Sequence, residues 1–217
     1  VIGLARANFV VHDYGAHLMM GFVTRWPERI QRLAICNSRA HRSFPIMPWL
    51  MFGLIGMFAR TPVLRDLLAQ APILALHRLL LLRYRRLGCF DHAQLERYLF
   101  WMRTSQGRRW FVRFFQDYRL ANPVGIEDGL ARFTAPVGII WGDRDPYCPP
   151  AVARDLAARL RQARVELQWV AGADHFVMEQ APDVVTRAIR RLLARPEREV
   201  AADALARLYA YVREAGQ

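Results

Sequence analysis

Strand-like runs stand on both sides of a long helical stretch, and this order limits the folds open to the chain. Residues 8–11 form a β-branched and aromatic run that meets a polar turn, after which apolar residues recur at helical spacing as far as Trp26. Residues 32–37 are a second buried-strand candidate. A strand, a helix and a further strand in this order predict the opening of a parallel α/β sheet.

The same alternation returns near the C-terminal end. We expect a strand at residues 136–142, a helix at about 149–162, a strand at 165–170 and a helix at about 181–193. After Pro196, apolar residues at helical spacing predict one more amphipathic helix. These patterns predict a core domain built from residues 1–38 and 133–195, with residues 196–217 as a C-terminal helical extension.

Residues 39–132 differ from both flanks because long apolar or amphipathic helical segments fill them. We therefore predict a helical cap inserted into the α/β core. Its uncharged run at residues 44–59 is 16 residues long and contains two prolines, which is short of the roughly 20 apolar residues that a membrane-spanning helix needs. The core or tunnel lining of a cap is the favoured interpretation, and contact with a membrane surface is the alternative.

The chain has 31 basic and 19 acidic residues among 217, and every basic residue is arginine. Most of the surplus positive charge falls in the predicted cap, but the arginines are spread from Arg6 to Arg213. A nucleic-acid reader would concentrate such charge in an aromatic or helix-turn-helix context, so we expect no nucleic-acid partner. The hydrophobic fraction of 53% is ample for a packed core and excludes a disordered chain.

Three cysteines, Cys36, Cys89 and Cys148, lie far apart, and none belongs to a C-x-x-C or Cys/His cluster. This pattern supports neither a disulfide framework nor a structural zinc site, and it predicts a cytoplasmic protein without a metal or other cofactor. The chain begins with valine, and its start lacks the organisation of a signal peptide. We expect a fragment whose front is missing.

Three polar segments come where a parallel sheet would present the carboxyl ends of its strands. They are residues 11–16 at a strand-to-helix turn, residues 141–146 at a strand end, and residues 172–176 after the last strand. A nucleophile on a tight strand-to-helix turn is pushed out of the sheet, and a small residue must stand two positions after it. Gly15 supplies that small residue after Asp13.

These segments, taken in order, resemble the α/β-hydrolase superfamily, and within it the branch of haloalkane dehalogenases and epoxide hydrolases, whose nucleophile is aspartate. The resemblance covers about residues 8–195. It implies a doubly wound, mainly parallel sheet with a helical cap, lacking here its N-terminal strands. It also implies Asp13 as the nucleophile, Asp145 as the acid and His175 as the general base. The backbone N–H of Tyr14 would serve the oxyanion hole.

The reaction that the resemblance implies has two steps. Asp13 would attack an sp3 carbon and form an alkyl-enzyme ester, and water activated by His175 would hydrolyse that ester. Asp145 would orient the imidazole and stabilise its charged form. The expected reactants are a small apolar electrophile and water.

Other catalytic residues fit less well. The sequence has only three serines, and none lies in a G-x-S-x-G motif, so a serine esterase is not expected. Cys148 lies in a proline-rich loop and is expected to be structural. Asp143 could replace Asp145 as the acid, but the family pattern places the acid three residues after the strand-ending glycine, which favours Asp145.

The choice between the two enzyme groups depends on the residue after the nucleophile and on the cap. Haloalkane dehalogenases usually carry tryptophan there to hold the halide, whereas this chain has Tyr14. Cap tryptophans could supply a halide donor and cap tyrosines could protonate an opening epoxide, although such residues are more often packing residues. The candidates are Trp49, Trp101 and Trp110 for the first role and Tyr84, Tyr98 and Tyr118 for the second.

Asn37 after the second strand and Val11 before His12 resemble dehalogenases more than epoxide hydrolases. We therefore predict a haloalkane dehalogenase-like hydrolase, with an epoxide hydrolase as the alternative. A third alternative is a catalytically silent fragment, or a homologue that binds lipid or a partner through its apolar cap and C-terminal helix. The sequence leaves the oligomeric state open, and His12 is expected to be structural.

Overall fold

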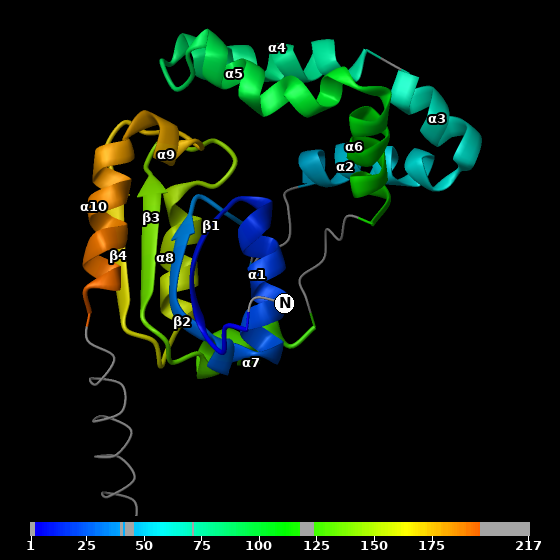
Figure 1. Ribbon diagram of the computed structural model, residues 1–217. Helices are drawn as coiled ribbons and strands as arrows, with labels where there is room; N and C mark the ends of the chain where they lie inside the picture. Colours follow the sequence, from blue (N-terminus) through cyan, green and yellow to red (C-terminus); the bar gives the residue numbers. More distant parts are fainter. Residues whose placement is uncertain (1–2, 40, 42–45, 71, 118–123, 196–217) are drawn as a thin grey trace, which may run out of the picture. The chain divides into compact units, whose positions relative to one another are not determined.

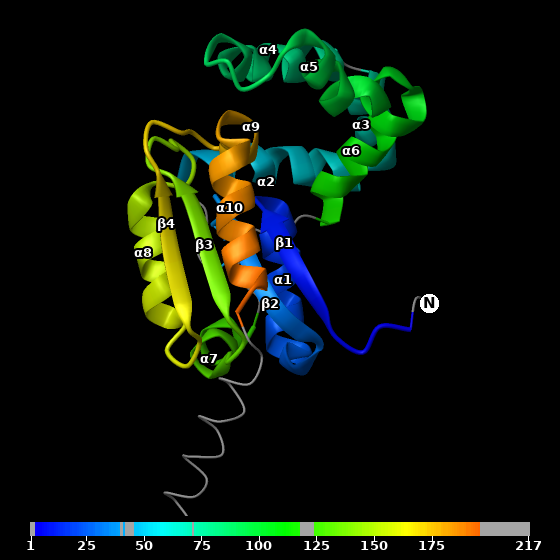
Figure 2. The same cartoon turned by 60° about the vertical axis from the view of Figure 1, so that its left-hand side comes forward.

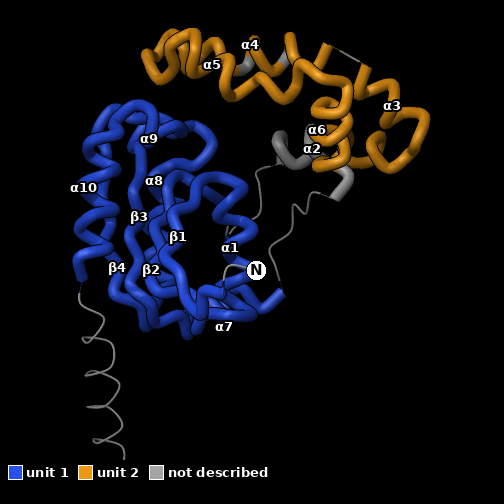
Figure 3. Tube along the Cα trace, viewed as in Figure 1, with its two compact units in different colours: residues 1–41, 123–217 blue, residues 42–122 orange. Residues whose placement is uncertain are grey.

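The computed structural model describes residues 3–39, 41, 46–70, 72–117 and 124–195, and it divides the chain into two compact units (Figure 3). Unit 1 consists of Val1–His41 and Pro123–Gln217. Unit 2 consists of Arg42–Asn122. A unit with a β-sheet is thus interrupted in sequence by a helical one.

Unit 1 contains a parallel sheet made of β1 (Ala7–His12), β2 (Ile30–Cys36), β3 (Val137–Gly142) and β4 (Val165–Val170) (Figure 1). The strands lie in the order β1-β2-β3-β4, and every neighbouring pair is parallel. Cys36 pairs with Ile140, so strands from either side of unit 2 are direct neighbours. The predicted strands and their parallel arrangement are confirmed.

Helices cover both faces of this sheet (Figures 1 and 2). One face carries α1 (Tyr14–Arg25), α7 (Ile126–Arg132) and α8 (Pro150–Arg159), and the other carries α9 (Val177–Gln180) and α10 (Pro182–Leu193). The alternation of side chains along β3 explains this layering: Ile139 and Trp141 belong to the core under α1 and α8, whereas Ile140 packs with α10. Burial of such side chains stabilises the fold by roughly 1.5–3 kcal/mol each.

The C-terminal limit predicted for the insert, residue 132, is wrong because α7 belongs to unit 1. Ile126 and Leu130 of α7 are buried in the same core as Val23 of α1. Gly129 allows the two helices to approach closely, since a Cβ on it would lie 2.5 Å from Cγ2 of Thr24. The short turn η1 (Pro27–Arg29) then leads from α1 into β2. A helix that follows other helices in sequence carries no local sign of which core it joins.

Unit 2 is helical throughout its described residues, as predicted for the insert. It consists of α2 (Ile46–Arg60), α3 (Pro62–Gln70), α4 (Ile73–Arg86), α5 (His92–Leu99), the short η2 (Phe100–Arg103) and α6 (Ser105–Asp117). Ala59, Ala69 and Val112 form a small core among α2, α3 and α6. Gly56 permits α2 to approach α6 closely, because a Cβ there would lie 2.7 Å from the carbonyl oxygen of Phe115.

The helix predicted after Pro196 lies outside the described residues. Among the described residues, no single helix is both long and apolar enough to cross a bilayer, and only α3 and α4 joined across a bend of 59° reach the required length and hydropathy together.

Candidate active site

Three polar side chains follow three different strands of unit 1. Asp13 comes directly after β1, Asp145 after β3 and His175 after β4. Because all four strands are parallel, their carboxyl ends meet at one edge of the sheet. The predicted nucleophile, acid and base are therefore brought to the same edge.

The imidazole of His175 lies between the two carboxylates. Its Nδ1 is 2.8 Å from Oδ2 of Asp145, and its Nε2 is 3.9 Å from Oδ1 of Asp13. The Asp145 side chain is fully buried, whereas the Asp13 side chain is 52% exposed. The buried carboxylate thus holds the ring, and the exposed carboxylate is open to a reactant.

The backbone at Asp13 forms a sharp turn between β1 and α1. Its φ of 46° and ψ of −118° lie outside the regions that side chains ordinarily permit, a conformation that costs on the order of 1–3 kcal/mol. The carbonyl oxygen of Asp13 accepts hydrogen bonds from the N–H of Ala16 at 3.1 Å and from the hydroxyl of Ser38 at 2.8 Å. These bonds hold the strained turn that lifts the carboxylate out of the sheet.

Tyr14, the predicted oxyanion donor, is the first residue of α1. Its backbone N–H hydrogen-bonds to the Asp13 carboxylate. Burial acts to raise the pKa of Asp13, and the larger effect of His175, with a smaller one from this bond, lowers it. Its ring stacks on His17 with centroids 5.3 Å apart. Tyr14 therefore contacts the Asp13 carboxylate through its main-chain N–H, while its ring stacks on His17.

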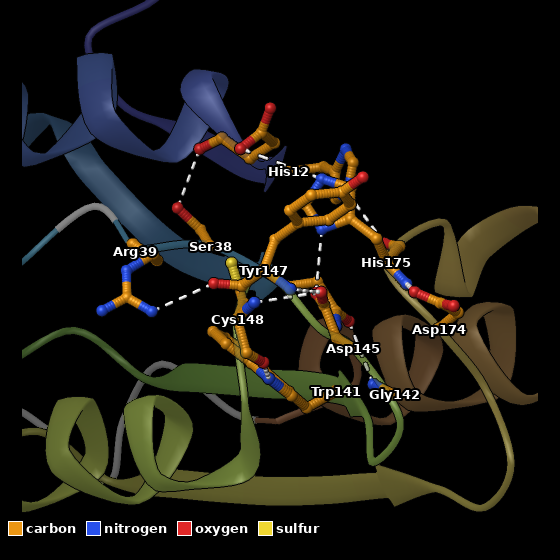
Figure 4. A network of polar contacts seen from close by, with 12 residues as sticks. His12, Ser38, Arg39, Trp141, Gly142, Asp145, Tyr147, Cys148, Asp174 and His175 are labelled. Carbon is orange, nitrogen blue, oxygen red and sulfur yellow. Dashed lines mark hydrogen bonds and ion pairs between the residues drawn. The ribbon is translucent and has the colours of Figure 1, made fainter. Parts of the chain in front are cut away.

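Asp145 is enclosed by hydrogen-bond donors (Figure 4). Its Oδ1 accepts from the backbone N–H groups of Tyr147 at 2.7 Å and Cys148 at 3.0 Å. Its Oδ2 accepts from Nδ2 of Asn37 at 2.7 Å and faces Nδ1 of His175. A carboxylate with this many donors is stabilised in its charged form.

The electrostatics of the site follow from this arrangement. Burial acts to lower the pKa of His175, but the carboxylates of Asp13 and Asp145, the second of which is hydrogen-bonded to Nδ1, outweigh burial and raise that pKa to about 12. Burial acts to raise the pKa of each carboxyl, and the hydrogen bond and charge of His175 outweigh it, so both carboxyl pKa values lie below their ordinary value. These shifts favour an imidazolium between two carboxylates near pH 7.

His12, directly before Asp13, lies beside this group. Its Nε2 is 3.0 Å from the carbonyl oxygen of His175, and because a carbonyl only accepts, the His12 ring donates from Nε2. The two imidazole centroids are 4.7 Å apart. Burial, reinforced by the charge of His175, lowers the pKa of His12 to about 4. His12 is therefore neutral near pH 7 and fixes the main chain that carries His175.

The loops after β3 and β4 cross very closely. A Cβ placed on Gly142 would lie 2.5 Å from the carbonyl oxygen of Asp174 and 2.6 Å from that of Ala173. Asp143 accepts a hydrogen bond from the N–H of Gly172 at 2.7 Å. Asp143, the alternative acid, thus ties the two loops together, while Asp145 is the carboxylate that contacts His175.

Asp145, Cys148 and His175 offer ligand atoms within 4.8 Å of one another, a cluster that could in principle hold a metal ion. Both oxygens of Asp145 already accept hydrogen bonds. Burial raises the pKa of the Cys148 thiol to about 11, which disfavours the thiolate that a metal requires. The donor set therefore suits a hydrogen-bonded carboxylate better than a metal centre, and the expectation of no cofactor stays a prediction.

The predicted cap tyrosines lie in unit 2 in different surroundings. Tyr84 is buried, and its ring contacts Phe90, whose ring also contacts Tyr98. Tyr98 is partly exposed. Tyr118 lies outside the described residues.

The predicted cap tryptophans also differ. The indole N–H of Trp101 donates to the carbonyl oxygen of Tyr98 at 2.9 Å, so this donor is engaged inside unit 2. Trp110 on α6 is 62% exposed. The side chain of Trp49 lies outside the described part of the structure.

Sequence reasoning missed much of the support around Asp145. It used Asn37 only as a resemblance to dehalogenases, whereas the Asn37 side chain donates to Asp145 and accepts from the N–H of Gly142 at 3.0 Å. A polar residue ending a buried strand was the available signal, and its φ of 26° is one that asparagine tolerates better than most residues. Gln180, which accepts from the N–H of Asp174, gave no such signal.

Comparison with known proteins agrees with the parallel α/β fold of unit 1. A family model described as "Alpha/beta hydrolase family" matches residues 3–188. A curated relative, the 2-hydroxy-6-oxononadienedioate/2-hydroxy-6-oxononatrienedioate hydrolase of Escherichia coli K12, is 23% identical over 202 residues. The match covers 90% of this chain, and the chain spans 65% of the length of that relative.

Solved structures show the same fold at low sequence identity. A variant of an epoxide hydrolase from Bacillus megaterium superposes with a TM-score of 0.60 at 17% identity, covering 89% of this chain and 71% of the other. An ancestral haloalkane dehalogenase superposes with a TM-score of 0.62 at 20% identity, covering 93% and 71%. The predicted fold class is confirmed. Since the family model spans most of the sequence, the chain belongs to the alpha/beta hydrolase family.

Proposed function

We propose that the protein is a hydrolase that attacks a small apolar electrophile with the carboxylate of Asp13. The observation that carries this proposal is the presence of an exposed aspartate on the strained strand-to-helix turn, 3.9 Å from the ring of His175. A nucleophile next to a base that a third group orients is the general signature of covalent catalysis. Asp145 is that third group.

In the first step, a carboxylate oxygen of Asp13 forms a bond to an sp3 carbon, and the bond from that carbon to its leaving group breaks. A halide would leave as the free anion, and an epoxide oxygen would stay attached and take up a proton from water. The low pKa of Asp13 keeps the attacking oxygen ionised near pH 7. The product of this step is an alkyl ester on Asp13.

Formation of the ester changes the state of His175. Asp13 loses its negative charge, so one of the groups that raise the pKa of His175 is removed. The imidazolium then releases its proton to bulk water more readily, and the neutral imidazole can take a proton from the water that attacks Cγ of Asp13. The alkoxide leaves with that proton, and the new carboxyl ionises. The N–H of Tyr14 would donate to the Asp13 oxygen that becomes negative in between.

Three classes of substrate are considered for this reaction. A haloalkane is the leading candidate, because Asn37 and Val11 resemble the dehalogenases of the branch. An epoxide is the alternative, since an epoxide hydrolase is among the structures that superpose. The curated relatives are named for dicarboxylate substrates, and a compound of that class is a third arm of the test.

The test is to trap the ester. The variant His175→Gln would be incubated with haloalkane, epoxide and dicarboxylate panels, and its peptides weighed by mass spectrometry. We expect an alkyl adduct on the peptide that contains Asp13, and no adduct in the matched variant Asp13→Asn. Release of halide, or formation of a diol without halide, then separates the two leading substrate classes.

Wild-type turnover in heavy-oxygen water provides a second readout. Because water attacks Cγ of Asp13, the heavy oxygen should appear in the Asp13 carboxylate. An adduct on another residue, or none in any panel from a variant that keeps the wild-type circular dichroism spectrum, would reject the mechanism and favour a catalytically silent homologue.

A further inference from the structure

Helix α6 of unit 2 presents arginines and aromatic rings together on its outer face. Arg109, Trp110, Arg113 and Phe114 repeat at a spacing of four residues, so they form one stripe along the helix. All four are exposed; Trp110 is 62% and Phe114 38% accessible. We call these four residues the α6 stripe.

The opposite face of α6 is the packed one. Val112 belongs to the small core with Ala59 and Ala69, and Phe115 is buried. Gly107 lies so close to the preceding turn that a Cβ on it would overlap the carbonyl oxygen of Trp101. The helix is therefore held by its inner face, and the α6 stripe remains exposed, although the ring of Phe114 also contacts Phe115 with centroids 5.3 Å apart.

The stripe lies in the most positive part of the chain. Residues 42–122 hold thirteen arginines against four acidic residues, whereas the whole chain holds 31 basic against 19 acidic residues. Unit 2 thus accounts for nine of the twelve net positive charges. A surface of this charge attracts anionic partners over a Debye length of about 8–10 Å.

We propose that the α6 stripe docks unit 2 on the surface of an anionic lipid bilayer. Tryptophan prefers the headgroup level of a membrane, where its ring is half in an apolar environment and its N–H meets water or phosphate. Arginine binds phosphate oxygens with two parallel hydrogen bonds. The exposed Phe114, one helical turn after Trp110, adds apolar area that enters the acyl boundary. The helix would lie in the plane of the surface.

Other occupants fit the stripe less well. A second copy docking stripe to stripe around a two-fold axis would bring the arginines of both copies together, and like charges in contact are unfavourable. A nucleic acid would satisfy the charge, but its phosphate backbone is polar and offers no apolar surface to the exposed rings of Trp110 and Phe114. This combination favours lipid over a fully polar polyanion.

The experiment is flotation of the full chain with vesicles. Vesicles of phosphatidylglycerol and phosphatidylcholine would be compared with phosphatidylcholine alone, and the bound fraction measured against lipid concentration. We expect binding only to the anionic vesicles, weakening as salt rises. Lipids brominated near the headgroup should quench tryptophan fluorescence, and Trp110→Phe should remove most of that quenching.

Paired substitutions locate the surface. The double variants Trp110→Ser with Phe114→Ser, and Arg109→Gln with Arg113→Gln, should each weaken binding by about tenfold or more. Matched controls lie elsewhere: Val63→Ser with Leu67→Ser removes exposed apolar side chains from α3, and Arg187→Gln with Arg190→Gln removes the same charge from α10 of unit 1. Neither control should change binding by more than about twofold.

Several results would overturn the proposal. They are the absence of binding to anionic vesicles, equal binding to neutral vesicles, or loss of binding in the controls but not in the α6 variants. Retention by double-stranded DNA in place of vesicles would assign the stripe to nucleic acid, and a dimer that the α6 variants dissociate would assign it to a second copy. Because all four positions are exposed, both α6 variants should keep the wild-type circular dichroism spectrum.

Discussion

The polar cluster around Asp145 in unit 1 is buried, whereas the ion pairs around Glu96 in unit 2 are exposed. In unit 1, Asp145, Asn37 and His175 are buried and satisfy one another through direct hydrogen bonds. In unit 2, Arg78 and Arg103 reach Glu96 from side chains that are 45% and 57% exposed. A buried network is strong but depends on every member, whereas exposed ion pairs are screened by solvent and salt. Sensitivity to substitution should therefore be concentrated in unit 1.

The largest effect is expected from Asp145→Asn. Both oxygens of Asp145 accept from donors, so an amide must turn one of its own donors toward them, and His175 loses the carboxylate that orients it. The hydrolysis step should slow by about 10³–10⁴-fold. Rapid-quench measurement should show the Asp13 ester accumulating.

The matched variant is Asp143→Asn. Its side-chain oxygen still accepts from the N–H of Gly172, and it does not touch His175. Turnover should change by less than about threefold, which corresponds to under 1 kcal/mol. Equal losses in the two variants would mean that the acid has been wrongly assigned.

A second comparison within unit 1 tests the close crossing of its loops. Gly142→Ala would place a Cβ against two backbone carbonyls, which cannot move aside cheaply, so the free energy of unfolding should fall by about 3 kcal/mol. Gly138→Ala on the same strand meets only Cδ2 of Leu192 at 3.3 Å, a flexible side-chain atom, and should cost less than about 1 kcal/mol. Urea denaturation of both variants measures the difference. Similar costs would show that the crossing is not tight.

These comparisons explain which features the sequence could predict. The strands and helices of unit 1 follow local hydrophobic periods, and Asp13, Asp145 and His175 each stand at a recognisable strand end, so their convergence follows from a parallel sheet. The enclosure of Asp145 does not follow, because Asn37 approaches it from a distant part of the chain. The predicted C-terminal boundary of the insert was wrong for the same reason, because only tertiary packing assigns α7 to unit 1.

A smaller effect is expected from His12 on the pH dependence of the free energy of unfolding. Its pKa is lowered to about 4, whereas an unfolded chain protonates it near 6.5. Between these values the unfolded state binds more protons, so the free energy of unfolding should fall as pH drops from 6.5 to 4, by at most about 3 kcal/mol. His12→Gln should remove most of this slope in urea titrations. The remainder comes from His17 and His77, whose pKa values burial also lowers.

The carboxylates of the site should not contribute to the change in stability between pH 6.5 and 4. The pKa values of Asp13 and Asp145 are lowered, so their contribution to stability is present above about 4 and is lost only as pH falls further. His175 has a raised pKa, and its contribution is lost as pH rises toward 12. If the free energy of unfolding of His12→Gln still falls between pH 6.5 and 4 as steeply as that of the wild type, His12 is not the cause of the fall.

The smallest effect is expected in unit 2. Glu96→Gln removes the ion pairs with Arg78 of α4 and Arg103 of η2, which connect three segments of the unit. Since both arginines are exposed, the melting temperature should fall only slightly, and wild type and variant should converge at about 1 M salt, where the Debye length is about 3 Å. The rate of ester formation at Asp13 should not change. A lower melting temperature that persists in high salt would mean that Glu96 acts through packing rather than charge. The polar groups of unit 2 would then stabilise it in the same way as those of unit 1, only more weakly.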